Sequence, residues 1–176
     1  MKKGIIILSL VSSLTEFGQN WEDIPVPADA VEGREWQLLD DVSDNFNYHA
    51  EAEYKGDTFN TKWKDSYVNA WTGGSNTTWQ PDQSFVDGSM LVLDANRKPG
   101  TTNEVIAGCL SSRQPITYPV FVETRAKLST SVLASCFWMI SLDQTQEIDI
   151  IEAFGTDRPG KEWYNTRQHL SHHVFI

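Results

Sequence analysis

The sequence has no sustained stretch in which apolar residues recur every three to four positions, so it predicts no long helix. One short helical turn is predicted at Lys161–Thr166. Short apolar or alternating runs are instead separated by Gly, Asn, Asp and Pro, which is typical of antiparallel β-structure. The pattern predicts an all-β fold, an antiparallel β-sandwich. The predicted strands are Tyr67–Trp71, Phe85–Val86, Met90–Ala95, Glu104–Ser111, Val120–Leu128, Ala134–Ser141, Gln146–Glu152 and His169–Ile176.

Two turns are predicted between the strands. Asp87-Gly88 lies between two apolar runs and is a strong signal for a tight hairpin. Arg97-Lys98-Pro99-Gly100 predicts a second turn.

Length and charge narrow the class of protein. The chain has 176 residues, of which 40% are hydrophobic, and this is enough for a packed core. Sandwich domains often need roughly 200–250 residues, and the sequence stops at Ile176 in mid-pattern, so we expect a fold truncated at its C-terminus. The net charge of −10 argues against a nucleic-acid partner and favours a neutral ligand over a polyanion.

The N-terminus predicts a secretory signal peptide over residues 1–19. Met1-Lys2-Lys3 is a basic start, and the apolar run that follows is too short to span a bilayer. The alternative is a buried first strand. We therefore expect a secreted, monomeric protein with no membrane contact after the signal is removed. Cys109 and Cys136 could pair in an exported protein or remain buried free thiols.

The most informative segment is acidic. In a strand, Glu147 and Asp149 share one face, and regular alternation would turn Glu152 into the core, where an unpaired carboxylate is costly. A β-bulge at Ile150-Ile151 would return Glu152 to the face of the other two acids. No Lys or Arg occurs between Leu128 and Asp157, so the carboxylates repel one another and at least one pKa should rise.

The spacing of the two glutamates is compatible with glycoside hydrolysis. Glu147 and Glu152 would lie four regular steps apart, or roughly 13 Å between Cα atoms. Side chains that lean together could approach the separation of about 5–5.5 Å that retaining glycosidases use, although the spacing alone does not exclude the wider inverting geometry. The alternative without a chemical role is a solvent-exposed strand face that carries three acidic side chains.

Glu147-Ile148-Asp149-Ile150-Ile151-Glu152 resembles the bulged E-x-D-x-x-E signature of glycoside hydrolase family 16. The flanking sequence is similar to the β-agarases and β-porphyranases of that family, from about Trp21 to the end, and leans toward β-agarase at His169–Ile176. The resemblance implies a concanavalin-like jelly roll, with residues 20–176 as the N-terminal part of the catalytic domain. It also implies a double displacement in which Glu147 is the nucleophile and Glu152 the acid/base. Asp149 would hydrogen-bond Glu147 and help to apportion the proton.

Aromatic and histidine residues supply candidate sugar contacts, because aromatic rings stack on the apolar faces of pyranoses. Trp138 resembles the aromatic residue at the family's cleavage subsite, and Trp71 resembles a platform for a more distant sugar. His173 matches a family histidine near the cleft; it shares a face by parity with His169, Ser171 and Phe175. Cys136 has the parity of Trp138, so it could also face the cleft.

The resemblance therefore implies an endo-hydrolase of agarose that cuts β-1,4 bonds of this red-algal galactan. Two alternatives stay open: a β-porphyranase that acts on a sulfated galactan, and a non-catalytic carbohydrate-binding sandwich. The chemistry requires no cofactor. Relatives often hold a structural calcium far from the cleft, so the resemblance implies a calcium site whose ligands are not assigned. The sequence has no Cys/His spacing of the zinc type.

Overall fold

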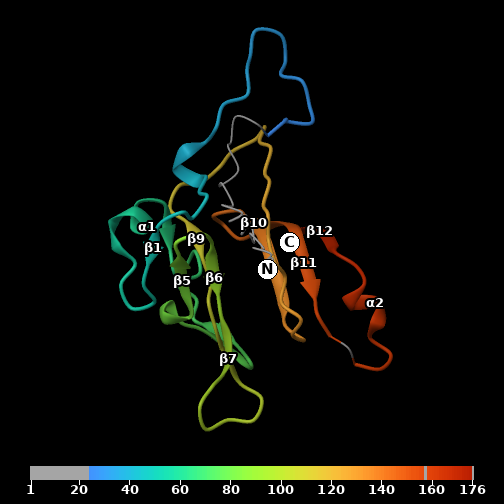
Figure 1. Cartoon of the computed structure of the whole chain (residues 1–176). Helices are drawn as coiled ribbons and strands as arrows, with labels where there is room; N and C mark the ends of the chain where they lie inside the picture. The colour runs from blue at the N-terminus through green and yellow to red at the C-terminus, as the bar shows by residue number, and fades with distance from the viewer. Residues whose placement is uncertain (1–23, 157, 176) are drawn as a thin grey trace, which may run out of the picture. The chain divides into compact units, whose positions relative to one another are not determined.

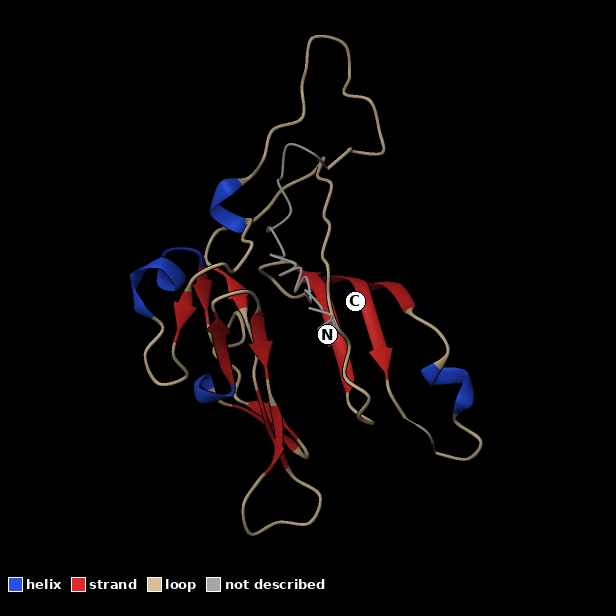
Figure 2. Cartoon of the chain, in the orientation of Figure 1, coloured by secondary structure: helices blue, strands red, loops and turns tan. Residues whose placement is uncertain are grey.

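The computed structural model describes residues 24–156 and 158–175. The chain divides into two compact units, Met1–Val120 and Phe121–Ile176, and each is described here by itself. Strands are the main regular secondary structure of both units, and loops make up much of the rest (Figures 1 and 2). The predicted signal peptide at residues 1–19 lies outside the described residues, and within the described part no helix is long and apolar enough to cross a membrane.

The first unit is built from short strands in three sheets. One sheet has the order β1-β5-β6, another has the order β3-β4-β8-β7, and β2 pairs with β9. All of these pairs are antiparallel except β4 and β8, which run parallel. The elements are η2 (Asp40–Val42), β1 (His49–Ala50), α1 (Gly56–Lys62), β2 (Trp63–Lys64), β3 (Gly73–Gly74), β4 (Thr77–Trp79), η3 (Pro81–Gln83), β5 (Ser84–Asp87), β6 (Leu91–Leu93), β7 (Ala95–Arg97), β8 (Val105–Ala107) and β9 (Ser111–Ser112).

A small apolar core holds α1 against the β1-β5-β6 sheet. Its fully buried members are Ala50, Phe59 and Val86. Phe59 is the one large apolar side chain of α1 that is buried, so this short helix is fixed by packing more than by its own seven residues. Partly buried residues surround the core: Phe46, Tyr48, Trp63, Leu91 and Leu110.

Both predicted turns of this unit are confirmed. Asp87-Gly88 joins β5 to β6, with a hydrogen bond from the Asp87 N–H to the Met90 carbonyl and a φ of 101° at Gly88. Gly100, with a φ of 80°, closes the turn after β7. Glycine suits both positions because residues with a Cβ rarely adopt a positive φ.

The second unit contains a three-stranded antiparallel sheet with the order β10-β11-β12. Its elements are β10 (Ala134–Ile140), β11 (Gln146–Phe154), α2 (Glu162–Asn165) and β12 (His169–Val174). All four were predicted from the sequence within a few residues. The sheet forms a continuous path from β10 through β11 to β12, and α2 lies on the connection between the last two strands (Figure 1).

The turn between β10 and β11 sets their register. One Asp143 carboxylate oxygen accepts hydrogen bonds from the Ser141 hydroxyl (2.6 Å) and from the Thr145 hydroxyl (2.8 Å) and N–H (3.2 Å). These bonds hold the pKa of Asp143 below its ordinary value. Because Ser141 also pairs its N–H with the Gln146 carbonyl, the turn brings the last residue of β10 opposite the second residue of β11.

Two predicted strands are absent from the structure, and a third, Glu104–Ser111, is interrupted, because it contains β8 and the first residue of β9, which belong to different sheets. Tyr67–Trp71 forms a turn, closed by a hydrogen bond from the Ala70 N–H to the Tyr67 carbonyl, with a φ of 60° at Ala70. Val120–Leu128 alternates as a strand would, yet it is assigned to no strand. Alternation describes which way side chains point, whereas a strand also needs a neighbouring strand to take its backbone hydrogen bonds, and no described strand is paired with this segment.

Candidate active site

One face of the β10-β11-β12 sheet gathers the predicted catalytic residues in three cross-strand rows. Residues directly opposite each other in antiparallel strands point to the same face. The rows are Ile140–Glu147–His173, Trp138–Asp149–Ser171 and Cys136–Glu152–His169. The three carboxylates thus share a face with Trp138 and His173, whereas Ile148 and Ile151 lie on the opposite face beside Met139 and Phe137.

A β-bulge in β11 produces this arrangement. On the β10 side, Phe137 pairs with Ile151 and the next residue, Trp138, pairs with Asp149, so Ile150 is skipped. On the β12 side the register also shifts between Asp149 and Glu152. The bulge predicted at Ile150-Ile151 is therefore present, and it returns Glu152 to the face of Glu147.

Glu147 lies in an environment that raises its pKa. Burial is the largest cause, and the negative charges of Asp149 and Glu152 act in the same direction. His173 opposes them and lowers the pKa. The Glu147 carboxyl is thus a weaker acid than a free glutamic acid, as the clustering of like charges predicts.

Asp149 is held by the neighbouring strand. The Ser171 hydroxyl donates a short hydrogen bond to its Oδ2, and His173 Nε2 lies 3.3 Å from the same oxygen. His173 Nε2 is also 3.0 Å from the Ser171 hydroxyl oxygen. The Asp149 side chain is only 12% exposed, so these contacts fix its orientation beside Glu147.

Glu152 has Cys136 on one side and His169 on the other. Surrounding protein atoms raise the pKa of the Cys136 thiol to about 11, with further contributions from Glu152, Asp149 and Glu147. His169 stacks on Tyr164, with ring centroids 5.7 Å apart, and meets Trp163 and Phe154 edge-on. Aromatic rings from α2 and from the end of β11 therefore pack around the His169 ring beside Glu152.

The predicted sugar contacts fall in different units. Trp138 lies in the central of the three rows, opposite Asp149. Trp71 belongs to the first unit, where it is 47% exposed and is supported edge-on by Tyr67 at 5.1 Å and by Trp79 at 6.3 Å. An exposed, laterally supported indole is suited to stacking on a sugar ring.

The sequence predicts no role for Ser171 beyond the parity that it shares with His169 and His173. The two-residue period places this serine on the acidic face, but only the β11–β12 register shows that it meets Asp149.

Among the described residues, one group has the composition and spacing of a metal site. Glu147, Asp149 and His173 each offer an atom within 4.8 Å of the others. Calcium prefers six to eight oxygen ligands, and this group offers two carboxylates and an imidazole nitrogen. These three groups alone do not make a calcium site, and no chemical step is assigned to a metal.

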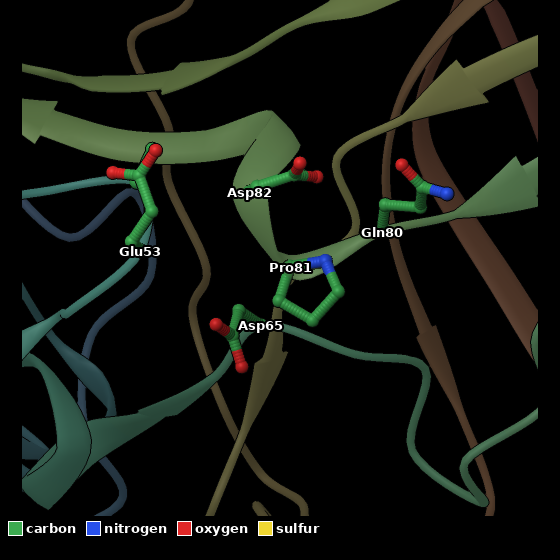
Figure 3. A pocket seen from close by; sticks show the side chains of 6 residues that line it. Glu53, Asp65, Gln80, Pro81 and Asp82 are labelled. Atoms are coloured by element: carbon green, nitrogen blue, oxygen red, sulfur yellow. The ribbon is translucent and has the colours of Figure 1, made fainter. Parts of the chain in front are cut away.

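The first unit contains an open hollow with an acidic lining. It is lined by Ala52, Glu53, Asp65, Gln80, Pro81 and Asp82. Figure 3 shows the side chains of Glu53, Asp65 and Asp82 around it. Lys55 neutralises part of this charge, since its ammonium lies 3.5 Å from Asp65 and donates to the Pro81 carbonyl at 3.0 Å. None of the predicted catalytic residues lines the hollow.

Comparison with known proteins identifies the family to which this chain belongs. A family model described as "Beta-porphyranase A-D, GH16 domain" matches residues 36–176. The chain belongs to glycoside hydrolase family 16.

Relatives within family 16 include agarases. A β-agarase of Microbulbifer thermotolerans is 48% identical over 172 residues, which is 98% of this chain and 39% of that protein. An extracellular agarase of Streptomyces coelicolor is 35% identical over 150 residues, which is 85% of this chain and 47% of that protein. The chain thus spans less than half the length of these two family 16 relatives.

A solved family 16 structure shares the fold. The crystal structure of an inactivated mutant of beta-agarase B in complex with agaro-octaose has a TM-score of 0.81 at 44% sequence identity. The match covers 89% of this chain and 54% of that one. The mostly β architecture predicted from the sequence is therefore the jelly-roll fold of the family 16 β-agarases, of which this chain spans about half.

Proposed function

We propose that this chain carries the catalytic carboxylates of a secreted, retaining endo-hydrolase of agarose. The observation that supports it most is the bulge in β11, which keeps Glu147, Asp149 and Glu152 on one face with Trp138. The β-agarases among its relatives support agarose as the substrate. The extracellular agarase among them supports secretion, as does the N-terminal signal pattern.

In the first step, the Glu147 carboxylate attacks the anomeric carbon of the galactose unit, and an ester bond to the enzyme forms. The bond from that carbon to the leaving oxygen breaks, and this oxygen takes the proton of Glu152. In the second step, Glu152 as a carboxylate takes a proton from water while the water oxygen attacks the same carbon. The ester breaks, Glu147 is released as a carboxylate, and the anomeric configuration is retained.

The neighbours of the two glutamates suit these roles. Asp149, oriented by Ser171 and His173, places a negative charge next to Glu147 and raises its pKa. Once Glu147 is esterified it carries no charge, so repulsion within the cluster falls as the intermediate forms. Trp138 in the central row offers an aromatic surface to the sugar at the cleavage point.

A β-porphyranase is the alternative activity, favoured by the description of the matching family model. Recognition of a sulfate ester calls for a cation, most often arginine. Among the nine residues of the three rows on the catalytic face, none is Lys or Arg. This composition favours the neutral galactan.

The test is a Glu147→Gln variant of the full-length protein, incubated with agarose and with porphyran. We expect cleavage to fall below about 10⁻⁴ of the parent rate, because the amide is a very poor nucleophile. Binding of agaro-octaose, measured by calorimetry, should persist. Glu123→Gln, on an exposed residue outside the three rows, is the matched control and should cleave like the parent.

Three outcomes would contradict the proposal. Turnover of neither polysaccharide by the parent protein would remove both activities and favour a non-catalytic sugar-binding role. Turnover of porphyran alone would select the alternative. Near-normal cleavage by Glu147→Gln would show that another group is the nucleophile.

A further inference from the structure

The bulge in β11 leaves one residue outside the regular hydrogen-bond ladder. Ile150 has no partner on β10, because Phe137 and Trp138 pair with Ile151 and Asp149. It has none on β12 either, where the paired positions pass from Asp149 to Glu152. A backbone carbonyl at such a position loses its cross-strand donor and needs a different partner.

Gln168 supplies the missing donor. Its side-chain amide donates a hydrogen bond of 2.7 Å to the Ile150 carbonyl. Gln168 directly precedes β12, whose first residue, His169, is paired with Glu152. Gln168 therefore binds the carbonyl of the bulged residue, Ile150, and the next residue along the chain, His169, lies beside Glu152.

We propose that Gln168 is a positioning residue for Glu152, which acts by holding the bulge of β11 in shape. This inference rests on the proposed function, in which Glu152 is the acid/base. Gln168 does not touch the reacting atoms. It keeps the Ile150 carbonyl bound, and the backbone at Ile150-Ile151 then presents Glu152 in one direction.

The effect should be specific to the acid/base half of the mechanism. Glu147 and Asp149 lie before the bulge and are paired in regular register with His173 and Ser171. Glu152 lies after the bulge, so the direction of its side chain depends on the backbone conformation at Ile150-Ile151. Loss of the Gln168 hydrogen bond should therefore displace Glu152 more than Glu147.

Two variants test this. Gln168→Leu removes the amide while keeping most of its bulk. Gln168→Glu keeps the shape but, as a carboxylate, has no proton to donate to a carbonyl. Gln37→Leu is the matched control, since Gln37 is exposed and its side chain donates a hydrogen bond to the exposed Glu35. Each protein is made at full length, and its thermal unfolding is measured alongside its activity.

The decisive readout compares two substrates. Agarose has a poor leaving group that needs the proton of Glu152, whereas a dinitrophenyl glycoside of an agaro-oligosaccharide has a leaving group that departs without one. For both Gln168 variants, kcat on agarose should fall about tenfold to 100-fold, as expected for a catalytic group misplaced by an ångström or less. The rate of aryl release in the first turnover should stay close to that of the parent.

Azide provides a second readout. As a small anionic nucleophile it needs no general base, so it should accelerate turnover of the aryl substrate by the Gln168 variants and give a glycosyl azide. It should have little effect on the parent or on Gln37→Leu.

Equal losses on both substrates, with a lower unfolding temperature, would show a purely structural role and overturn the inference. Parent-like activity of Gln168→Leu on agarose would overturn it as well. An inactive parent would instead refute the proposed function, so the two failures are distinguishable.

Discussion

The substitution His173→Gln is expected to shift the pH dependence of catalysis. A positive charge beside a carboxyl group favours the ionised form of that group. His173 lowers the pKa of Glu147, against the raising effects of burial, Asp149 and Glu152. The His173→Gln variant would keep a hydrogen-bonding amide near Ser171 but would lose the charge. The pKa of Glu147 should then rise further.

The size of the shift follows from the distance. A carboxylate oxygen of Glu147 and a ring nitrogen of His173 lie within 4.8 Å of each other. At that separation a pair of unit charges interacts by about 0.9 kcal/mol in water, which corresponds to about 0.6 pKa unit. The dielectric constant of water gives the lower limit of the effect, because the His173 side chain is 46% exposed but Glu147 is partly buried. Added salt would reduce the effect further.

The sign of the change in activity follows from the role of Glu147. A nucleophile must be ionised, so kcat/KM falls as the pH drops through the pKa of Glu147. A higher pKa moves this acid limb to higher pH, by at least about half a unit. The assay is the release of reducing ends from agarose between about pH 4 and pH 8, at constant ionic strength.

His172→Gln is the matched control for this experiment. His172 is the preceding residue of β12 but pairs with Ile148 and points to the opposite face of the sheet. Its replacement should leave the acid limb in place. An acid limb that does not move in His173→Gln, or that moves equally in both variants, would refute the electrostatic coupling.

Two further predictions concern other parts of the second unit. Gly155→Ala should lower the free energy of unfolding by about 1–3 kcal/mol in urea titrations, because its Cβ would lie 2.3 Å from Thr130 Cα, a backbone atom that cannot rotate away; an unchanged midpoint would contradict this packing. Cys136 should be alkylated by iodoacetamide at pH 8 far more slowly than free cysteine, since a pKa of about 11 leaves only about one thiol in a thousand ionised. A rate equal to that of free cysteine would contradict the raised pKa.

Local chemistry made much of the second unit predictable from its sequence. Alternation places Glu147 and Asp149 on one face, and the cost of burying Glu152 requires a bulge at Ile150-Ile151. The structure contains that bulge. The hairpin at Asp87-Gly88 was predictable for a similar reason, since the conformation of a tight turn depends on the residues within it.

The failures share one physical cause. Val120–Leu128 alternates like a strand, and Tyr67–Trp71 has the composition of one, yet neither is a strand in the structure. Whether an extended segment joins a sheet depends on a partner that its own residues do not specify. Neither side-chain pattern nor β-propensity carries that information.

The sequence by itself determined which side chains of β11 share a face, because the two-residue period and the energetic penalty for a buried charge are properties of the segment itself. Only the tertiary structure decided what lies opposite each of them: His173 beside Glu147, Ser171 bonded to Asp149, and Gln168 bonded to the Ile150 carbonyl. Those contacts depend on how the connection through α2 returns β12 to the sheet. A shift of one residue there would exchange the two faces of β12 and replace Ser171 with a neighbour that cannot make the same hydrogen bond.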